Sequence, residues 1–283
     1  MKLRHPSVSG AFYSATPESL KNQIRGCFLS KLGPNLLPPA DKKGPRSIVA
    51  AVCPHAGYMY SGPTAAHSYY NLAADGKPKR IVIIGPNHTG MGSPVSLMSE
   101  GSWKTPLGSV SVDRELALRI LQKSKTIDDN EEAHLMEHSV EVQLPFLQFI
   151  YGDFDFVPLC MMLQDLRTSV DVGKSIGEAC AGEDVVIIAS SDFTHYEPQE
   201  KAAHKDRLAI DAILELDPEK LLTTVRDQNI TMCGAGPIAS ALIAAKKLGA
   251  KSARLASYST SGDVVGDYGA VVGYASIILL RNT

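Results

Sequence analysis

The feature of this sequence that most restricts its fold is a regular alternation of short apolar runs with longer helical patterns. Short runs rich in Val and Ile are typical of buried strands, and apolar residues at helical spacing are typical of amphipathic helices. Strands separated by helices of about 10–15 residues form βαβ units with a largely parallel sheet. The predicted strands span 47–52, 80–84, 95–98, 109–112, 154–159, 184–189, 253–258 and 270–279, and the predicted helices span 16–31, 63–72, 114–123, 137–150, 170–181, 199–216, 218–226 and 237–248.

This pattern predicts a single α/β domain over residues 1–283, in which a largely parallel or mixed central sheet lies between two layers of helices. Hydrophobic residues make up 44% of the chain, which is ample for a large core. The longest apolar run, residues 270–280, is interrupted by polar and glycine residues and is shorter than the roughly 20 residues of a membrane-spanning helix. We therefore expect a buried strand there and no association with a membrane.

Charge, cysteines and missing motifs exclude several function classes. A formal net charge of -2 provides no electrostatic attraction for nucleic acid or an anionic membrane. The five cysteines are odd in number and lack CxxC spacing, and the N-terminal residues lack an apolar signal segment. These features predict a cytoplasmic protein without a disulfide framework. No GxGxxG, GxxxxGK[ST] or GxSxG motif is present, which argues against a nucleotide cofactor and against serine hydrolysis.

Histidines follow three of the predicted strands, at the points where ligands bind in open α/β sheets. His55 follows strand 47–52, His88 follows strand 80–84 and His195 follows strand 184–189. Imidazole is the commonest neutral metal ligand, and two or three histidines with one anionic ligand form a divalent-metal site with open positions. The candidates for the anionic ligand are Asp192, Cys233, Glu137 and Glu141.

Cys233 is the cysteine with a predicted functional role. It lies in a glycine-rich loop that opens helix 237–248, and a helix N-terminus lowers the pKa of a thiol. The resulting thiolate would bind a metal or act as a nucleophile. His138 and Glu141 are three residues apart and would share one face of helix 137–150, where they could assist acid–base chemistry.

Several of these segments also carry a resemblance to a known family. They are 6–13, 54–58 with 61–62, 85–88, 137–141 with 144–145, 190–195, and 233–234 before 237–238. In content and order they resemble the Memo family, also called the AmmeMemoRadiSam system protein B group. The resemblance implies a fold similar to the class III extradiol dioxygenases, which use non-haem iron to cleave catechol-like rings. It also implies companion proteins of the AmmeMemoRadiSam system as partners.

The resemblance implies roles for individual residues. His55 and His88 correspond to metal-binding histidines, and Cys233 falls where the dioxygenases carry a carboxylate ligand. Iron is the metal that this implies, although a thiolate also accommodates copper or zinc. The predicted catalytic residues are His195, which is suited to proton transfer, Asp192 and His138; the predicted substrate contacts are Tyr58, Asn87, Glu141 and Tyr196.

Three functions remain open at this stage. The first is a metal-dependent redox enzyme of dioxygenase-like design, with His195 as proton shuttle. The second is a zinc- or cysteine-dependent hydrolase, in which Cys233 is the nucleophile and His195 its base. The third is an adaptor that binds a peptide or small ligand in the cleft without chemistry, through tyrosines such as Tyr58, Tyr60 and Tyr196.

Overall fold

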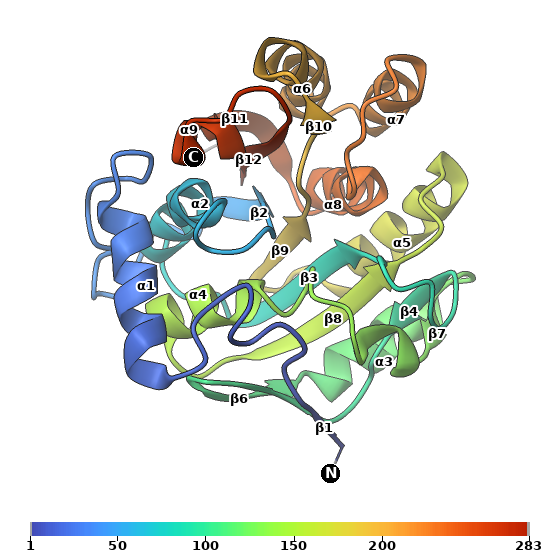
Figure 1. Ribbon diagram of the computed structural model, residues 1–283. Helices are drawn as coiled ribbons and strands as arrows, with labels where there is room; N and C mark the ends of the chain where they lie inside the picture. The colour runs from blue at the N-terminus through green and yellow to red at the C-terminus, as the bar shows by residue number, and fades with distance from the viewer. Residues whose placement is uncertain (1, 282–283) are drawn as a thin grey trace.

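The centre of the protein is a group of four parallel strands, shown in Figure 1 for the computed structural model, which describes residues 2–281. Their order across the sheet is β8 (Asp155–Met161), β3 (Arg80–Pro86), β9 (Val185–Ser190) and β2 (Ile48–Cys53). Nearly every residue in them is buried, because helices cover both faces of the sheet. The mixed, mostly parallel sheet between helices confirms the predicted fold class.

Further strands extend this sheet at both edges, antiparallel beyond β2 and in both directions beyond β8. Beyond β2 lies β12 (Val271–Arg281), which pairs with β11 (Ala250–Thr260) and β10 (His195–Glu197). Beyond β8 lie β6 (Gly108–Val112), β5 (Ser102–Thr105), β1 (Leu3–Arg4), β4 (Val95–Leu97) and β7 (Asp128–Asp129). The predicted strands 95–98 and 109–112 correspond to β4 and β6, and these two strands do not pair with each other. A tight turn joins β5 to β6, and these two strands pair with each other. Strand β4 pairs with β8.

The helices form two layers, which Figure 1 shows on opposite sides of the central strands. One layer contains α1 (Pro17–Leu29), α2 (Gly62–Ala74) and α4 (Gln143–Tyr151), which contact one another. The other contains α3 (Arg114–Lys123), α5 (Leu166–Ala179) and α8 (Ala235–Lys247), with α7 (Pro218–Asp227) packed on α8 and α6 (Gln199–Leu214) on α7 and β11. The remaining short pieces are η1 (Glu132–His134) and α9 (Ser261–Val265).

The helix predicted over 137–150 is the main error in the expected elements. Helix α4 begins only at Gln143; residues 137–138 are irregular and 139–142 form a turn. The carboxylate of Glu137 accepts the backbone N–H groups of His138 and Ser139 and two N–H groups of His88, so tertiary contacts hold this segment. Pro145 therefore lies in the first turn of α4, where its missing N–H requires no kink.

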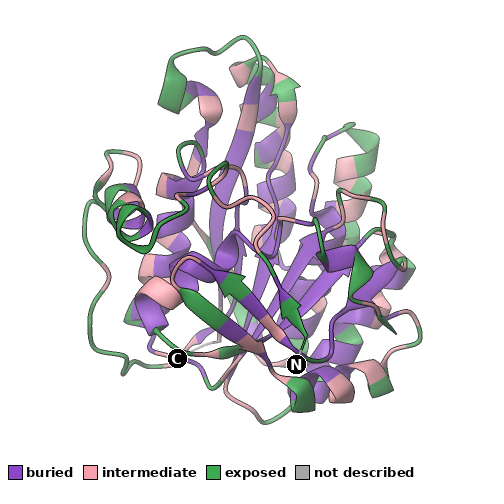
Figure 2. Cartoon of the chain, turned by 60° about the horizontal axis from the view of Figure 1, so that its bottom comes forward, coloured by how far each residue is buried: buried purple, intermediate pink, exposed green. Residues whose placement is uncertain are grey.

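The buried interior is continuous along the central strands, which Figure 2 shows almost uniformly buried, while exposed residues lie in loops, on helices and on strands at the sheet edge. This packing provides a rigid base for the loops that follow the strands. Within residues 2–281, none of the helices combines the length and the apolar character needed to cross a membrane.

Candidate metal centre

The strand order brings the predicted metal ligands to one place. Because β9 lies between β2 and β3, the loops after these strands meet at the same edge of the sheet, and the start of α8 packs beside them. One ligand atom each from His55, His88 and Cys233 lies within 4.8 Å of the others. Cys233 Sγ is 3.2 Å from His55 Nε2. The juxtaposition expected from the sequence is therefore present.

A hydrogen-bond chain determines which nitrogen of His55 faces the thiol. The Ser190 hydroxyl donates its one proton to the Ser139 carbonyl (2.7 Å) and accepts from the Gln143 side-chain amide (2.7 Å). Its 2.8 Å contact with His55 Nδ1 must therefore be accepted from an Nδ1–H. Burial lowers the pKa of His55 well below its ordinary value, so the ring is neutral and Nε2 carries a lone pair. That is the form of imidazole that binds metals.

Glu137 holds His88 in the same tautomer. One carboxylate oxygen lies 2.9 Å from His88 Nδ1, and the other accepts the His88 backbone N–H at 2.5 Å. Burial alone would raise the pKa of Glu137, but the hydrogen bonds from His88 and from the Ser139 backbone lower it to about 2. The ionised carboxylate accepts the Nδ1–H, so Nε2 of His88 is left for a ligand. A carboxylate that orients a metal-binding histidine in this way is a common feature of metal sites.

A third imidazole ring completes the cluster. His138 stacks on His88, with ring centroids 4.6 Å apart, and lies edge-on to His55 at 5.5 Å. Phe12 packs against its other side at 4.9 Å. Burial lowers the pKa of His138, so this ring also adds no fixed positive charge at neutral pH. The position of His138 comes from the irregular segment and turn at 137–142 and not from the helix that was predicted there.

The Cys233 thiol is half-buried, and its pKa differs from the expectation. The Asp192 backbone N–H donates to Sγ at 3.2 Å, which favours the thiolate. Burial nevertheless raises the pKa of the thiol, with the Asp192 carboxyl as a further cause, so the predicted lowering by the helix N-terminus is wrong for the metal-free site. Desolvation outweighs the helix dipole here. A bound cation would reverse this balance, because metals deprotonate coordinating thiols.

Asp192 and His195 lie beside the three candidate ligands. Asp192 Oδ1 accepts the backbone N–H of His55 at 2.8 Å, and burial raises the pKa of Asp192 to about 6. His195 lies at the start of β10, and its Nδ1 is 2.7 Å from the Thr231 carbonyl. A carbonyl only accepts, so His195 carries its proton on Nδ1 when neutral, and Nε2 is free to accept one.

The four residues predicted to contact substrate differ in how much of the side chain is exposed to solvent. Tyr58 and Glu141 are buried, and their polar atoms bond within the protein, Tyr58 to the Val142 carbonyl and Glu141 to backbone N–H groups. The Asn87 side chain organises the turn that carries His88. Tyr196 is 78% exposed, with a left-handed backbone φ of 60°. Of these residues Tyr196 alone presents most of its side chain to solvent, and substrate contact by any of them remains a prediction.

Sequence reasoning missed the supporting residues Ser190, Gln143 and Arg4. Ser190 and Gln143 orient His55, and Arg4 binds the turns at 134–141. Ser190 ends a predicted strand, Gln143 falls within a predicted helix and Arg4 lies near the N-terminus. None of these positions carries a local signal of its role, because each partner lies far away in the sequence.

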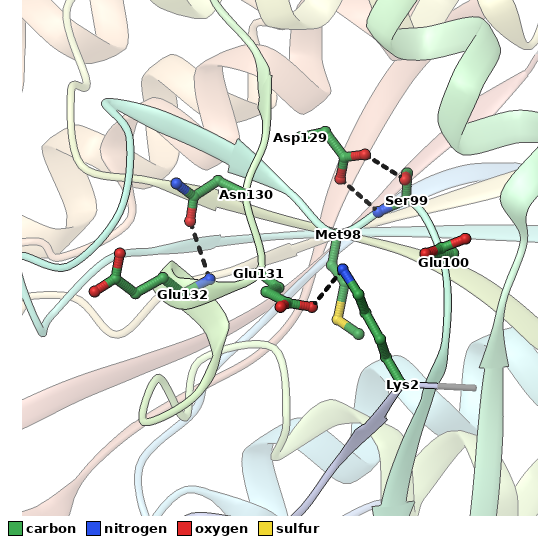
Figure 3. Close-up of a pocket in the computed structure, with 8 residues that line it drawn as sticks. All are labelled: Lys2, Met98, Ser99, Glu100, Asp129, Asn130, Glu131 and Glu132. Carbon is green, nitrogen blue, oxygen red and sulfur yellow. Dashed lines mark hydrogen bonds and ion pairs between the residues drawn. The ribbon is translucent and has the colours of Figure 1, made fainter.

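A separate acidic pocket of about 280 Å³ does not form part of this centre. Its side chains pair among themselves, as Figure 3 shows: Lys2 with Glu131 at 2.9 Å, and Asp129 with the backbone and hydroxyl of Ser99. The residues that line it are Lys2, Met98, Ser99, Glu100, Asp129, Asn130, Glu131 and Glu132. None of the candidate ligands lies among them.

Comparison with known proteins places this chain in a family. The profile described as Memo-like protein matches residues 4–278. A MEMO1 family protein of Methanopyrus kandleri is 50% identical over 98% of this chain and 99% of its own length, and one of Sulfolobus acidocaldarius is 49% identical over 97% and 98%. The crystal structure of an uncharacterized protein from Escherichia coli K12 shares the fold, with a TM-score of 0.57 at 14% identity over 82% of this chain and 99% of that one. The chain belongs to the Memo-like protein family.

Proposed function

We propose that this protein is a metal-dependent redox protein in which His55, His88 and Cys233 hold a redox-active ion, with iron as the first candidate and copper or zinc as alternatives. One observation carries the proposal: two imidazoles of determined tautomer and a thiol have ligand atoms within 4.8 Å of one another. Bonds of about 2.1 Å to nitrogen and 2.3 Å to sulfur separate the ligands of a tetrahedral ion by about 3.5 Å. The three atoms therefore need to approach by about 1.3 Å at most.

The donor set fits a reactive centre better than a structural one. Structural sites are closed by four protein ligands, whereas three ligands leave positions for water or substrate. His88 is the exposed member of the set, with 34% of its side chain accessible, so those positions are reachable from solvent. When bound, the ion would supply Lewis-acid and electron-transfer chemistry. A nitrogen and thiolate set suits iron, copper or zinc, and the first two support redox change.

The neighbouring groups are suited to move protons. Asp192, with its pKa raised to about 6, changes protonation near neutral pH, where a general acid or base is most effective. His195 has a free Nε2, because its Nδ1–H donates to Thr231. These two side chains are the proposed proton donor and acceptor, and His138 is the third candidate.

The surroundings favour a small organic ligand. A pocket of about 550 Å³ reaches the centre through Cys233 alone, and its wall combines charged side chains with apolar ones that include Leu222, Val225 and Met232. Exposed apolar residues also follow the central strands, among them Tyr60 after β2 and Met162 after β8. Pockets with an apolar wall and a few polar groups are typical of small-molecule sites. Companion proteins of the AmmeMemoRadiSam system remain a further prediction.

The test is elemental analysis of protein purified without oxygen. The parent should contain iron or copper at close to one ion per chain, and His55→Ala and Cys233→Ala should each lose it. Cys180→Ala is the matched control, because Cys180 is buried away from the site. The metal-loaded parent should then consume oxygen with a catechol-like probe. Equal metal content in all four proteins, or metal without any oxygen consumption, would contradict the proposal.

The hydrolase alternative has less support. It required His195 as the base for Cys233, but the thiol bonds to His55 Nε2, and burial raises the thiol pKa in the metal-free site. A nucleophilic cysteine needs the opposite shift. These contacts disfavour Cys233 as a nucleophile, whereas a zinc-dependent hydrolase would use the same three ligands and stays an alternative prediction.

Binding without chemistry is the second candidate function, and Tyr196 supports it. Its left-handed backbone and 78% exposure hold an aromatic ring outward beside His195. A non-glycine residue in this conformation is uncommon and is often associated with function. If the protein only binds a peptide or small ligand in the cleft, His55→Ala should bind that ligand with the affinity of the parent. Tyr196→Ala should bind it more weakly.

A further inference from the structure

The 134–142 loop, which we define as residues 134–142, supports both metal histidines although most of it lies in no helix or strand. Glu137 in this loop orients His88. The Ser139 carbonyl accepts from Ser190, which in turn accepts the Nδ1–H of His55. Whatever keeps this loop in place therefore also determines where the two Nε2 atoms point.

Arg4 is the residue that holds this loop from outside. Its guanidinium is almost fully buried and donates from Nε to the His134 carbonyl at 2.9 Å and from Nη2 to the Glu137 carbonyl at 2.6 Å. The remaining nitrogen forms an ion pair with Glu141. The group also lies 4.4 Å from the centre of the Trp103 ring, a cation–π distance. One side chain thus contacts the loop at three points.

Glu141 ties the same loop to the segment that carries Arg4. Its carboxylate accepts the backbone N–H groups of Ser7 (2.8 Å) and Val8 (3.1 Å) and the hydroxyl of Tyr13 (2.5 Å). Arg4 and Glu141 therefore form a reciprocal connection between the N-terminal segment and the loop. Buried charges that are fully hydrogen-bonded in this way make a rigid network.

We propose that Arg4 is a positioning residue of the metal centre, which acts through the backbone of Glu137 on the orientation of His88. This inference rests on the proposed metal-binding function. Arg4 is suited to the task because a planar guanidinium directs several donors at once to fixed acceptors. Lysine in its place would keep the charge near Glu141 but could not reach both carbonyls. The N-terminal segment that carries Arg4 then helps to orient a metal ligand and does not only pack against the site.

Two measurements on the full chain test this role. The first follows the His88 Nδ1–H proton of the metal-free protein by ¹⁵N-edited NMR, which reports the hydrogen bond to Glu137 directly. The second is a Co²⁺ titration, in which thiolate-to-metal absorption reports the complete ligand set. Arg4→Met should lose the His88 Nδ1–H signal and bind Co²⁺ about tenfold more weakly. Arg114→Met, an exposed arginine paired only loosely with Glu100 at 3.6 Å, should match the parent.

Further variants separate positioning from charge balance and from folding. Arg4→Met with Glu141→Gln removes both charges, and it should bind Co²⁺ as weakly as Arg4→Met because the two carbonyl contacts are still missing. Arg4→Lys is the variant to use if Arg4→Met does not fold, and it should also bind more weakly than the parent. Recovery of affinity in the double variant, or parental Co²⁺ affinity in Arg4→Lys, would overturn the proposal.

Failure of the metal-binding function itself would look different. In that case the parent would show no Co²⁺ absorption, whereas the NMR measurement on metal-free protein would still decide the role of Arg4. A His88 Nδ1–H signal that persists unchanged in both Arg4 variants would overturn the inference.

Discussion

Replacing Glu137 with Gln removes the charge that orients His88 while keeping the shape of the side chain. Four N–H groups converge on this carboxylate: those of His88 at the backbone and at Nδ1, and the backbone groups of His138 and Ser139. Glutamine offers one oxygen, and its NH2 group must face at least one of these donors. A buried donor left without an acceptor costs about 1–3 kcal/mol.

The pKa of Glu137 provides a second estimate of the stability lost in Glu137→Gln. It is lowered from 4.5 to about 2, mainly by hydrogen bonds from His88 that overcome the effect of burial. A difference of roughly 2.5 units corresponds to about 3 kcal/mol of folding stability at neutral pH. The folded state favours the ionised form, so this contribution is complete above the unfolded pKa and is lost as the pH falls from about 5 towards 2. The pKa route predicts a loss of about 3 kcal/mol at pH 7 in Glu137→Gln, at the upper end of the roughly 1–3 kcal/mol expected for one unsatisfied donor.

Urea unfolding of the metal-free protein measures this loss. The difference in unfolding free energy between the parent and Glu137→Gln should shrink from about 3 kcal/mol at neutral pH to about 2 kcal/mol near pH 3.5. Glu132→Gln, at an exposed position of the neighbouring 3-10 turn, should unfold like the parent. A variant that loses less than about 1 kcal/mol at neutral pH, or whose deficit grows as the pH falls, would refute the reasoning.

Three further predictions concern the same centre. Ser190→Ala removes the acceptor of the His55 Nδ1–H, so Co²⁺ affinity should fall about tenfold, and an unchanged titration would mean that packing alone orients the ring. Gly234→Ala places a Cβ 2.5 Å from the Ser190 carbonyl oxygen and should lower urea stability by about 1–3 kcal/mol, whereas Gly26→Ala, with open space around it, should not; equal stabilities would contradict this. Burial raises the pKa of Cys233, so iodoacetamide should label the metal-free thiol slowly at neutral pH and faster as the pH rises. Mass spectrometry measures the labelling, and rapid labelling that does not depend on pH would disprove the raised pKa.

The site could be predicted in part because its ligands follow strands directly. Strands β2, β3 and β9 are short and rich in Val and Ile, and His55 and His88 each come two residues after such a strand. The start of the helix predicted over 137–150 was wrong, and no local feature of the sequence reveals this. Its apolar spacing fits a helix, whereas the Glu137 carboxylate binds His88, which lies 49 positions away and is reported by no local pattern.

The sequence by itself determined the fold class and the candidate ligands, because apolar periodicity and the residues that follow each strand are local properties. The tertiary structure decided which atoms face the centre. His55 and Ser190 are 135 positions apart, and Arg4 and Glu137 are 133 apart, so these contacts exist only once β9 lies between β2 and β3 and the N-terminal segment packs on the 134–142 loop. Burial, which no local pattern reports, also raises the pKa of Cys233 and lowers that of His55, so both side chains are held in their neutral forms.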